Sequence, residues 1–274
     1  MKRLVVLVLL AVVLASCKKG APEESEPETS LPVITGKIIG GWYDGVQIQA
    51  TLVSDGGSPL TEHGVCWGTA PNPTMSANKI PTQSILEFVE IKHLPLNVKH
   101  YFRCYAVNKK GVAYGNEIEF TAQLSAGMEY AGGKVVYIED SGIHGLVVSS
   151  ENLGSAKFDN VPDNFYSSKA FSVSDGKGNT DKIIATYGYN GNAAAKCRMY
   201  RGGGYSDWYL PAMEQLHRIY NSASNDKTFA NYYYWSSTED SSYIGNAWCI
   251  GFHNEVYGTS LKSFSYMVRA VRDF

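Results

Sequence analysis

The sequence predicts two folded domains, an all-β sandwich followed by an α+β domain with short helices and twisted antiparallel strands. A length of 274 residues suits about two domains. Residues 33–121 contain short alternating segments between turn residues, a pattern typical of antiparallel sandwiches. Residues 125–274 combine one well-patterned helix with several short strand-like segments. The 19 Tyr, 27 Gly and 5 Trp residues agree with short strands and tight turns and argue against a helical bundle.

The overall composition excludes two broad classes of protein. With 44% hydrophobic residues, the chain has enough apolar side chains to build cores, so it is not disordered throughout. Its 24 Lys and Arg residues against 26 Asp and Glu residues leave no basic excess to neutralise a phosphate backbone. We therefore expect no nucleic-acid partner.

The first seventeen residues have the features of an exported lipoprotein. Lys2 and Arg3 precede an apolar run, residues 4–14, and small residues follow it. This run is too short for a membrane-spanning helix, which needs about 20 residues. The tetrapeptide LASC, which ends at Cys17, is similar to the lipobox of bacterial lipoproteins. We expect residues 1–16 to be a signal peptide and Cys17 to be lipidated; an ordinary signal peptide cut at another bond is the alternative.

The lipobox resemblance implies an anchor in the cell envelope. It implies a diacylglycerol thioether on Cys17 and an acylated amine, and several acyl chains together anchor a protein stably in a membrane. The residue after Cys17 is Lys18 and not Asp. In the lipoproteins that this sequence resembles, the absence of Asp at that position favours passage to the outer membrane. We expect an outer-membrane lipoprotein, with surface exposure left open. Residues 17–32 contain four Glu and three Pro but no aromatic residue, which predicts an extended acidic tether.

Residues 33–122 are predicted to form the sandwich. Alternation over 46–52 and 100–108 predicts strands, and the Gly, Pro, Ser and Asn residues between such segments predict turns. The motifs SDGGSPLTEHGVCWGTAPNPT (54–74) and LPLNVKHYFRCYAVNKKGVAYGNEIEF (94–120) resemble fibronectin type III-like modules of bacterial surface lipoproteins. The resemblance implies an immunoglobulin- or fibronectin-like sandwich that acts as a spacer.

Strand parity also predicts the state of two cysteines in this sandwich. Cys104 shares the core face with Phe102, whereas Cys66 is offset by one residue from Val65 and Trp67. If Val65 and Trp67 point inward, the two cysteines face opposite sides. We therefore expect two separate thiols rather than a disulfide.

The second domain, 125–274, has a less regular pattern. Its segments 132–138 and 145–148 predict a hairpin, and 152–182 predicts a long irregular stretch. Residues 193–198 suit a short helix, and apolar residues at 3–4 spacing predict the clearest helix over 211–222. Four short strands are predicted after it, near 233–237, 246–253, 255–262 and 265–272.

Five motifs in this domain identify a family. In order they are GGKVVYIEDSGIHGLVVSS, GGGYSDWYLPAMEQL, YYYWSSTED, NAWCIGF and YMVRAVRDF. Over roughly 127–274 they resemble the C-terminal domain family named after the collagen-like bacterial adhesin Lcl. The resemblance implies a C-type-lectin-like fold, and an adhesin of this kind engages sulfated glycans through a basic surface. Here 8 Lys and 5 Arg stand against 15 Asp and Glu, a net charge of −2, which departs from that pattern and puts sulfated polymers in doubt.

Several residues of these motifs are predicted to be structural. Asp207 ends a glycine-rich turn and is expected to bond local backbone amides. Trp208, Trp235 and Trp248 are expected to pack in the interior. Arg269 and Arg272 are expected to pair with Asp207 or Glu239 as a buried fork, because Arg suits bidentate geometry.

The alternative role for exposed residues of this domain is a sugar-binding face. Sugar rings stack on aromatic side chains, and sugar hydroxyls need amides and carboxylates around them. In a strand, Tyr232 and Tyr234 would share a face, and Tyr233 would point away. The candidate ligand contacts are Tyr232, Tyr234, Tyr243, Asn246, His253, Asn254, Glu255 and Tyr257.

Metal, disulfide and catalytic sites have weaker signals. Residues 175–181 supply oxygen ligands for calcium within one loop but lack the EF-hand pattern, so we expect no cofactor, with calcium as the alternative. A disulfide between Cys197 and Cys249 is compatible with an oxidising envelope. The motifs of common hydrolases and nucleotide-binding enzymes are absent from the sequence, so we expect no enzyme.

These observations together predict a noncatalytic surface lipoprotein that acts in adhesion or glycan binding through its C-terminal domain. The expected partners are the membrane, through the lipid, and an extracellular glycan or an envelope or host protein. A structural, protein-docking lipoprotein that binds no sugar is the alternative. An envelope hydrolase with two converging carboxylates is a further one.

Overall fold

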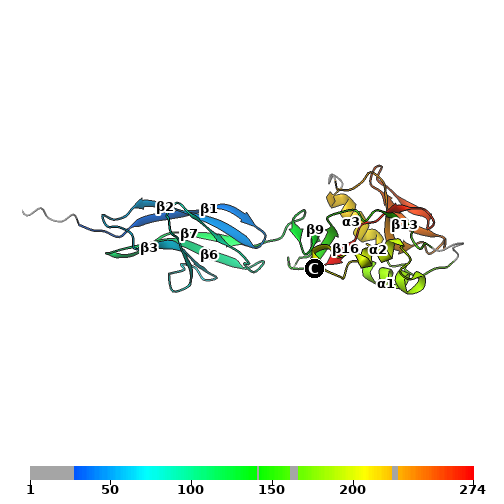
Figure 1. Cartoon of the computed structure of the whole chain (residues 1–274), viewed down its shortest axis with the longest axis horizontal. Helices are drawn as coiled ribbons and strands as arrows, with labels where there is room; N and C mark the ends of the chain where they lie inside the picture. The colour runs from blue at the N-terminus through cyan, green and yellow to red at the C-terminus, as the bar shows by residue number, and fades with distance from the viewer. Residues whose placement is uncertain (1–27, 141, 161–165, 224–227) are drawn as a thin grey trace, which may run out of the picture.

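The computed structural model describes residues 28–140, 142–160, 166–223 and 228–274, arranged as a sandwich and an α+β domain along one long axis (Figure 1). The predicted signal peptide, the lipidation site Cys17 and most of the acidic tether lie outside the described residues. None of the helices in the described ranges is long and apolar enough to cross a membrane.

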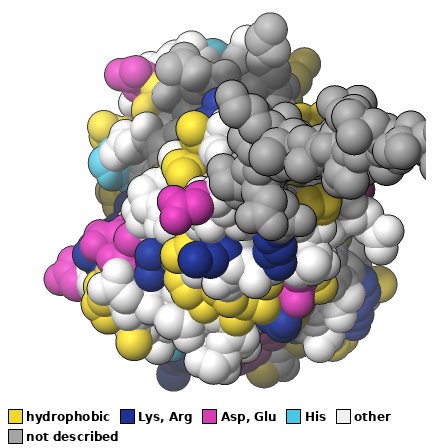
Figure 2. Space-filling view, turned by 90° about the vertical axis from the view of Figure 1, so that its left-hand side faces the viewer, with side chains coloured by type: hydrophobic (Ala, Val, Ile, Leu, Met, Phe, Trp, Pro, Cys, Tyr) yellow, Lys and Arg dark blue, Asp and Glu magenta, His cyan; other side chains and the backbone are white. Residues whose placement is uncertain are grey.

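The first domain is a sandwich of two antiparallel sheets, as predicted. One sheet has the strand order β1-β2-β5, and the other has the order β4-β3-β6-β7. The strands are β1 (Val33–Trp42), β2 (Gly45–Ser54), β3 (Glu62–Gly68), β4 (Asn78–Pro81), β5 (Phe88–Ile91), β6 (Lys99–Asn108) and β7 (Gly111–Thr121). Seen from the sandwich end, hydrophobic, basic and acidic side chains are interspersed on the visible face (Figure 2).

The strand register explains the cysteines of the sandwich. Val65 pairs with Cys104, and Cys66 pairs with Arg103, so the two cysteines lie on opposite faces of their sheet. Cys104 is buried in the core between the sheets. Cys66 is buried on the other face, where its Sγ donates to the carbonyl of Pro73 at 3.4 Å. Both are free thiols, as the strand parity predicted.

In its described residues, the second domain contains one antiparallel sheet, one mixed sheet and three short α-helices. The sheet orders are β16-β10-β9-β8 and β11-β15-β12-β13-β14. Its strands are β8 (Glu129–Tyr130), β9 (Gly133–Ile138), β10 (Gly145–Ser149), β11 (Ser155–Ala156), β12 (Tyr233–Glu239), β13 (Asn246–Gly251), β14 (Val256–Leu261), β15 (Tyr266–Met267) and β16 (Val271–Asp273). Its helices are α1 (Gly176–Tyr187), α2 (Ala193–Met199), the short 3-10 helix η1 (Gly202–Gly204) and α3 (Met213–Ala223).

The predicted helices over 193–198 and 211–222 are confirmed as α2 and α3. The prediction of an irregular stretch over 152–182 is wrong in its last part, because α1 begins at Gly176. Asp175 caps this helix, since its carboxylate accepts from the backbone N–H of Gly178 at 2.7 Å. Gly176 itself has no room for a side chain, because a Cβ there would lie 2.7 Å from the backbone nitrogen of Ala212.

The single strand predicted over 265–272 is two short strands in different sheets. Met267 pairs with Tyr234 of β12, whereas Val271 pairs with Val148 of β10. The residues between them, 268–270, are buried. This segment therefore links the two sheets of the domain through its interior.

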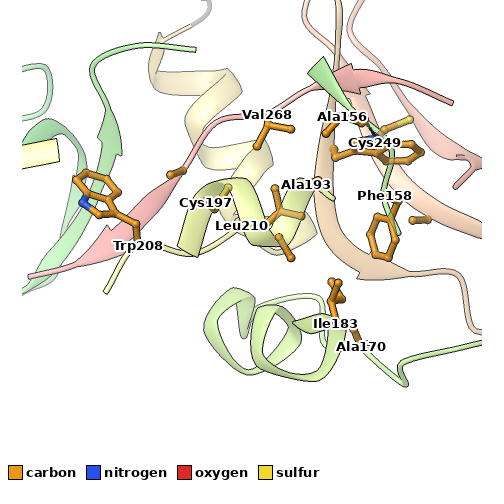
Figure 3. Close-up of a cluster of buried hydrophobic side chains, with 14 of the residues drawn as sticks. Ala156, Phe158, Ala170, Ile183, Ala193, Cys197, Trp208, Leu210, Cys249 and Val268 are labelled. Carbon is orange, nitrogen blue, oxygen red and sulfur yellow. Dashed lines mark hydrogen bonds between the residues drawn. The ribbon is translucent and has the colours of Figure 1, made fainter. Parts of the chain in front are cut away.

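Two apolar clusters fill the second domain, one on each side of β12. Trp235 belongs to the cluster that includes α1 and α2, and its neighbour Tyr234 belongs to the cluster under α3. Figure 3 shows the first cluster, with Trp208 at one end and Phe158 and Cys249 at the other. The alternation of β12 thus buries both of its faces, which leaves the start of the strand as its accessible part.

Candidate functional site

A cavity of about 320 Å³ opens where β11, β12 and β15 meet. This volume lies at the lower end of the range of about 300–1,000 Å³ that is usual for small-molecule sites. Its lining is formed by Ser155, Tyr232, Tyr233, Ser265, Tyr266 and Met267. We call this cavity the tyrosine pocket.

Strand pairing brings these residues together from three distant parts of the chain. Ser155 pairs with Met267, and β15 runs parallel to β12. As a result, the rings of Tyr233 and Tyr266 stack, with centroids 5.1 Å apart and an interplanar angle of 27°. The stacked rings of Tyr233 and Tyr266 therefore belong to paired strands, which hold them on a rigid frame.

Hydrogen bonds and ring contacts hold the two stacked tyrosines in place. The hydroxyl of Tyr266 lies 2.8 Å from the Oγ of Ser260. The hydroxyl of Tyr233 accepts from Asn254 Nδ2 at 3.4 Å, and the His253 ring contacts Tyr233 edge-on, with centroids 5.1 Å apart. Both tyrosine rings are partly buried, so little side-chain freedom remains to be lost when a ligand binds.

Tyr232 is the most exposed of the three tyrosines in the pocket lining, with 66% of its surface accessible. It precedes β12, so the alternation expected from a continuous strand does not apply to it. Its backbone is fixed nevertheless, because its carbonyl accepts from the N–H of Phe252 at 3.0 Å. Tyr232 and Tyr233 consequently line one cavity, contrary to the predicted parity.

Tyr234 is not available to a ligand, and its prediction as a contact is wrong. It is 0% exposed and packs under α3. Its hydroxyl accepts from the N–H of Ala230 and donates to Asn152 Oδ1, both at 2.8 Å. A buried tyrosine with both hydrogen-bonding roles filled is part of the core.

The other predicted contacts are spread over the domain. His253 and Asn254 lie behind the pocket wall, where both contact Tyr233. Tyr243 and Asn246 lie at the turn between β12 and β13, at the opposite end of β12 from Tyr232.

The last two predicted contacts, Glu255 and Tyr257, lie on the α3 side. There the Tyr257 ring contacts His217 edge-on, with centroids 5.2 Å apart. A hydrogen bond to Glu255 raises the pKa of Tyr220. The eight predicted residues therefore do not form one site.

Five residues of the lining were not predicted as ligand contacts: Ser155, Tyr233, Ser265, Tyr266 and Met267. Tyr266 is 33 positions from Tyr233 in the sequence, and only the parallel pairing of β15 with β12 brings the two together. The run of three tyrosines was a usable signal for part of the pocket. The remaining lining had none, because short two-residue strands leave no periodic pattern.

Two other depressions differ from the tyrosine pocket in charge. One, of about 460 Å³, includes Glu151 and Lys196 in its lining. The other, of about 560 Å³, includes Glu139, Asp140 and Arg218. Of these three cavities, all lined by described residues, the tyrosine pocket is the one whose lining has no charged side chain.

Asp207 and Arg272 form the bidentate fork that Arg geometry favours, but the prediction that this fork is buried is wrong, because the Asp207 side chain is 49% exposed. Arg272 donates to the two carboxylate oxygens at 2.8 and 3.0 Å. The hydrogen bond from Arg272 lowers the pKa of Asp207. Trp208 next to it is buried, and its Nε1 donates to the carbonyl of Gly202 at 3.2 Å. These contacts agree with structural roles for Asp207 and Trp208.

Glu239 pairs with Lys262, and not with either of the arginines expected to reach it. The Lys262 ammonium lies 2.8 Å from Glu239 Oε1, and the side chains are 1% and 0% exposed. Ser168 also donates to this oxygen, from its N–H and its hydroxyl, both at 3.1 Å. Arg269 instead donates to Ser149 O at 2.9 Å and to Asn152 Oδ1 at 3.1 Å.

The two remaining tryptophans of the motifs occupy different surroundings. Trp235 is fully buried, and its Nε1 donates to the carbonyl of Ala156 at 3.0 Å. Trp248 is half-buried on β13, and its carbonyl accepts from Ser236 Oγ at 2.8 Å. Neither side chain lines the tyrosine pocket.

The residues predicted as the alternative calcium loop form a helix. Residues 176–181 are the first half of α1; Asp175 caps it, and Asp181 pairs with Arg198. Across the described ranges, no group of three or more His, Cys, Asp or Glu side chains is placed to hold a metal ion.

Cys197 and Cys249 do not form the disulfide that an oxidising envelope would allow. Both are buried free thiols in the cluster of Figure 3. Their sulfurs donate to different carbonyls, Cys197 to Arg269 at 3.7 Å and Cys249 to Gly258 at 3.5 Å. Each thiol therefore acts as a small packing residue.

Residues 158–272 match the model of the Lcl C-terminal domain family. This match agrees with the resemblance carried by the motifs that follow residue 157, whereas the first motif, at 132–150, lies outside the matched residues. No curated protein matches the chain in sequence.

Solved structures similar to the chain include fibronectin type III domains. One is the sixth such domain from human fibronectin type III domain containing protein 3, with 19% identity, 38% of this chain and 98% of that chain covered, and a TM-score of 0.31. Another is such a domain of human collagen XX, with 14% identity, 34% and 94% covered, and a TM-score of 0.28. The match to the Lcl C-terminal domain model, beside an antiparallel β-sandwich, fits a surface or adhesin-like protein.

Proposed function

We propose that this protein is a noncatalytic lipoprotein of the outer membrane that adheres to an external glycan through its C-terminal domain. The observation that carries the proposal is the tyrosine pocket, with exposed Tyr232 beside the stacked rings of Tyr233 and Tyr266. Aromatic faces of this kind suit the C–H faces of sugar rings, while the hydroxyls of the lining suit those of the sugar.

The position of the sandwich supports an adhesive role. The sandwich and the C-terminal domain follow one another along one axis (Figure 1), and the sandwich is the domain that comes after the predicted tether in the sequence. At the joint, the ring centroids of Tyr43 and Tyr130 are 5.4 Å apart, and those of Tyr130 and Phe274 are 5.0 Å apart. This aromatic contact favours a stiff connection, which would hold the pocket away from a membrane that bears the Cys17 lipid.

Glycan binding is tested by screening the purified chain on an array of neutral, acidic and sulfated glycans. We expect reproducible binding that is weakened by Tyr232→Ala. Tyr243→Ala is the matched control, because Tyr243 is 69% exposed but lies at the other end of β12. The absence of binding to every glycan would contradict the proposal and leave protein docking as the function to be tested.

The lipid anchor needs its own test, because Cys17 lies outside the described residues. We expect Cys17→Ser to release the protein from the membrane fraction of expressing cells, while the parent chain stays with the outer membrane. Retention of the variant in the membrane fraction would contradict lipid anchoring at this position.

A further inference from the structure

We infer that the tyrosine pocket takes an uncharged sugar ring, and that neither an acidic group on the sugar nor a calcium ion contributes to binding. This inference rests on the proposed glycan-binding function and names its ligand class. It departs from the sulfated ligands that the family resemblance implies.

The chemistry of the lining favours an uncharged ligand. Its six residues, all within the described ranges, are three tyrosines, two serines and one methionine, with no Lys, Arg, Asp or Glu. Hydroxyl groups both donate and accept hydrogen bonds, as sugar hydroxyls do. A sulfate or carboxylate only accepts, and sites for such anions are built from Arg, Lys or clustered N–H donors.

A basic residue near the pocket is already neutralised. Lys262 begins the turn that carries Ser265, so its ammonium would be the natural cation for an anionic ligand. It is instead turned into the interior and lies 2.8 Å from Glu239, with 1% of the side chain exposed. A paired, buried charge of this kind offers no net positive field to a ligand in the pocket.

One exposed lysine lies close to the pocket in sequence. Lys157 follows Ser155 by two residues but does not contribute to the lining. It therefore provides a direct test of charge. We expect its removal to leave the binding of a neutral sugar unchanged, whereas binding that depended on an anionic group would be weakened.

The shape of the wall also suits a sugar ring. Tyr233 and Tyr266 are nearly parallel, and Trp235 packs against Tyr266 with centroids 4.6 Å apart. These contacts fix the rings before any ligand arrives. The ring of Tyr232, which is 66% exposed, is the aromatic face left open beside them for a sugar ring to stack on.

The experiment is calorimetric titration of the full chain with lactose, maltose and chitobiose as neutral probes and with heparin and chondroitin sulfate as anionic probes. Each titration is repeated in high salt and with EDTA. We expect a neutral probe to bind with an affinity that is unchanged by salt or EDTA. Tyr232→Ala should weaken it about tenfold, because an aromatic contact contributes that order of affinity.

Three variants serve as controls. Tyr243→Ala and Lys157→Ala should bind a neutral probe as the parent chain does, and Tyr232→Trp should retain binding because it keeps an aromatic ring. Thermal unfolding of each variant establishes that the domain is folded. Tyr232 is suitable for replacement because most of its side chain is exposed.

Binding of the anionic probes alone, or binding that falls with salt and in Lys157→Ala, would overturn the inference while glycan adhesion stands. Binding that EDTA abolishes, or that Tyr232→Ala leaves unchanged, would overturn it as well. Failure of every probe and of every glycan on the array would instead overturn the proposed function.

Discussion

Replacing Lys262 with Met should destabilise the C-terminal domain strongly. The substitution keeps a long side chain but removes the ammonium that lies 2.8 Å from Glu239. Because the carboxylate is 0% exposed, water cannot replace the lost partner. The Ser168 N–H and hydroxyl stay bonded to it, each at 3.1 Å, but they bring no charge.

The expected loss follows from the burial of the pair. Breaking a buried ion pair by removing one partner costs about 3–5 kcal/mol, since it leaves an uncompensated charge. The exposed pair of Lys79 and Glu62 is a control, because its side chains are 37% and 35% exposed. Lys79→Met should cost at most about 1 kcal/mol.

The pH dependence provides a second signature of the same pair. Burial alone would raise the pKa of Glu239, but the bonds from Lys262 and Ser167 outweigh it and lower the pKa. A carboxyl group whose pKa is lowered by folding stabilises the fold at pH values above its pKa in the unfolded chain. This stabilisation is lost as the pH falls below that pKa. In Lys262→Met, the carboxylate loses its counterion and its pKa rises. As the pH falls toward about 4.5 the variant should regain stability, and below that value the parent should lose its own contribution, so the stability difference between them shrinks on acidification.

The assay is urea unfolding followed by tryptophan fluorescence, since Trp208 and Trp235 report on the C-terminal domain. A double variant, Glu239→Leu with Lys262→Met, should recover most of the loss, because apolar replacement of both partners removes the buried charge. The role assigned to the pair is refuted if Lys262→Met costs no more than Lys79→Met, or if the double variant is less stable than the single one.

Tests at four other buried positions should have distinct outcomes. Tyr234→Phe should lower the free energy of unfolding by about 1–3 kcal/mol, because it leaves buried hydrogen-bonding groups without their partner. It should leave glycan binding intact, and weakened binding in a folded variant would contradict the assignment of Tyr234 to the core. Gly64→Ala should destabilise the sandwich by at least about 2 kcal/mol, since a Cβ there would lie 2.1 Å from the backbone oxygen of Ile80; unchanged urea unfolding would contradict this packing. Burial raises the pKa of Cys104 and of Cys249 to about 12, so iodoacetamide should label these thiols at neutral pH only after unfolding. Labelling is followed by mass spectrometry, and rapid labelling of the native chain would show that the thiols are accessible.

The sequence predicted the elements that carry a periodic pattern. The helix α3 has apolar residues at 3–4 spacing, and the structure places it only slightly later than predicted. The helix α1 was missed because Gly176 and Gly178 made its start resemble a loop, although Asp175 is a good capping residue. Burial of Gly176 against Ala212, distant in sequence, explains why glycine is found there, and no local pattern reveals such a contact.

The candidate site was predictable only in part, for a related reason. Tyr232 was identified as an exposed aromatic residue, but its partner Tyr266 lies in a two-residue strand. Strand parity failed at Tyr232, because β12 begins one residue later. A pocket built from strand ends depends on which strands pair, and this pairing is a property of the whole domain.

Stability and ligand binding should be separable in this domain, although both involve the turn that follows β14. The backbone of Lys262 is held on both sides, by its N–H to the carbonyl of Gly245 at 2.9 Å and by its carbonyl to the N–H of Phe158 at 3.0 Å. The position of the turn, and with it Ser265, therefore does not depend on the ammonium alone. We expect Lys262→Met to lower the free energy of unfolding but to keep the affinity for a neutral sugar. We expect Tyr232→Ala to lower that affinity but to keep the free energy of unfolding. If each variant lowers both the free energy of unfolding and the affinity for a neutral sugar, the Lys262–Glu239 pair and the tyrosine pocket form one cooperative unit. Binding of a neutral sugar would then depend on the ion pair.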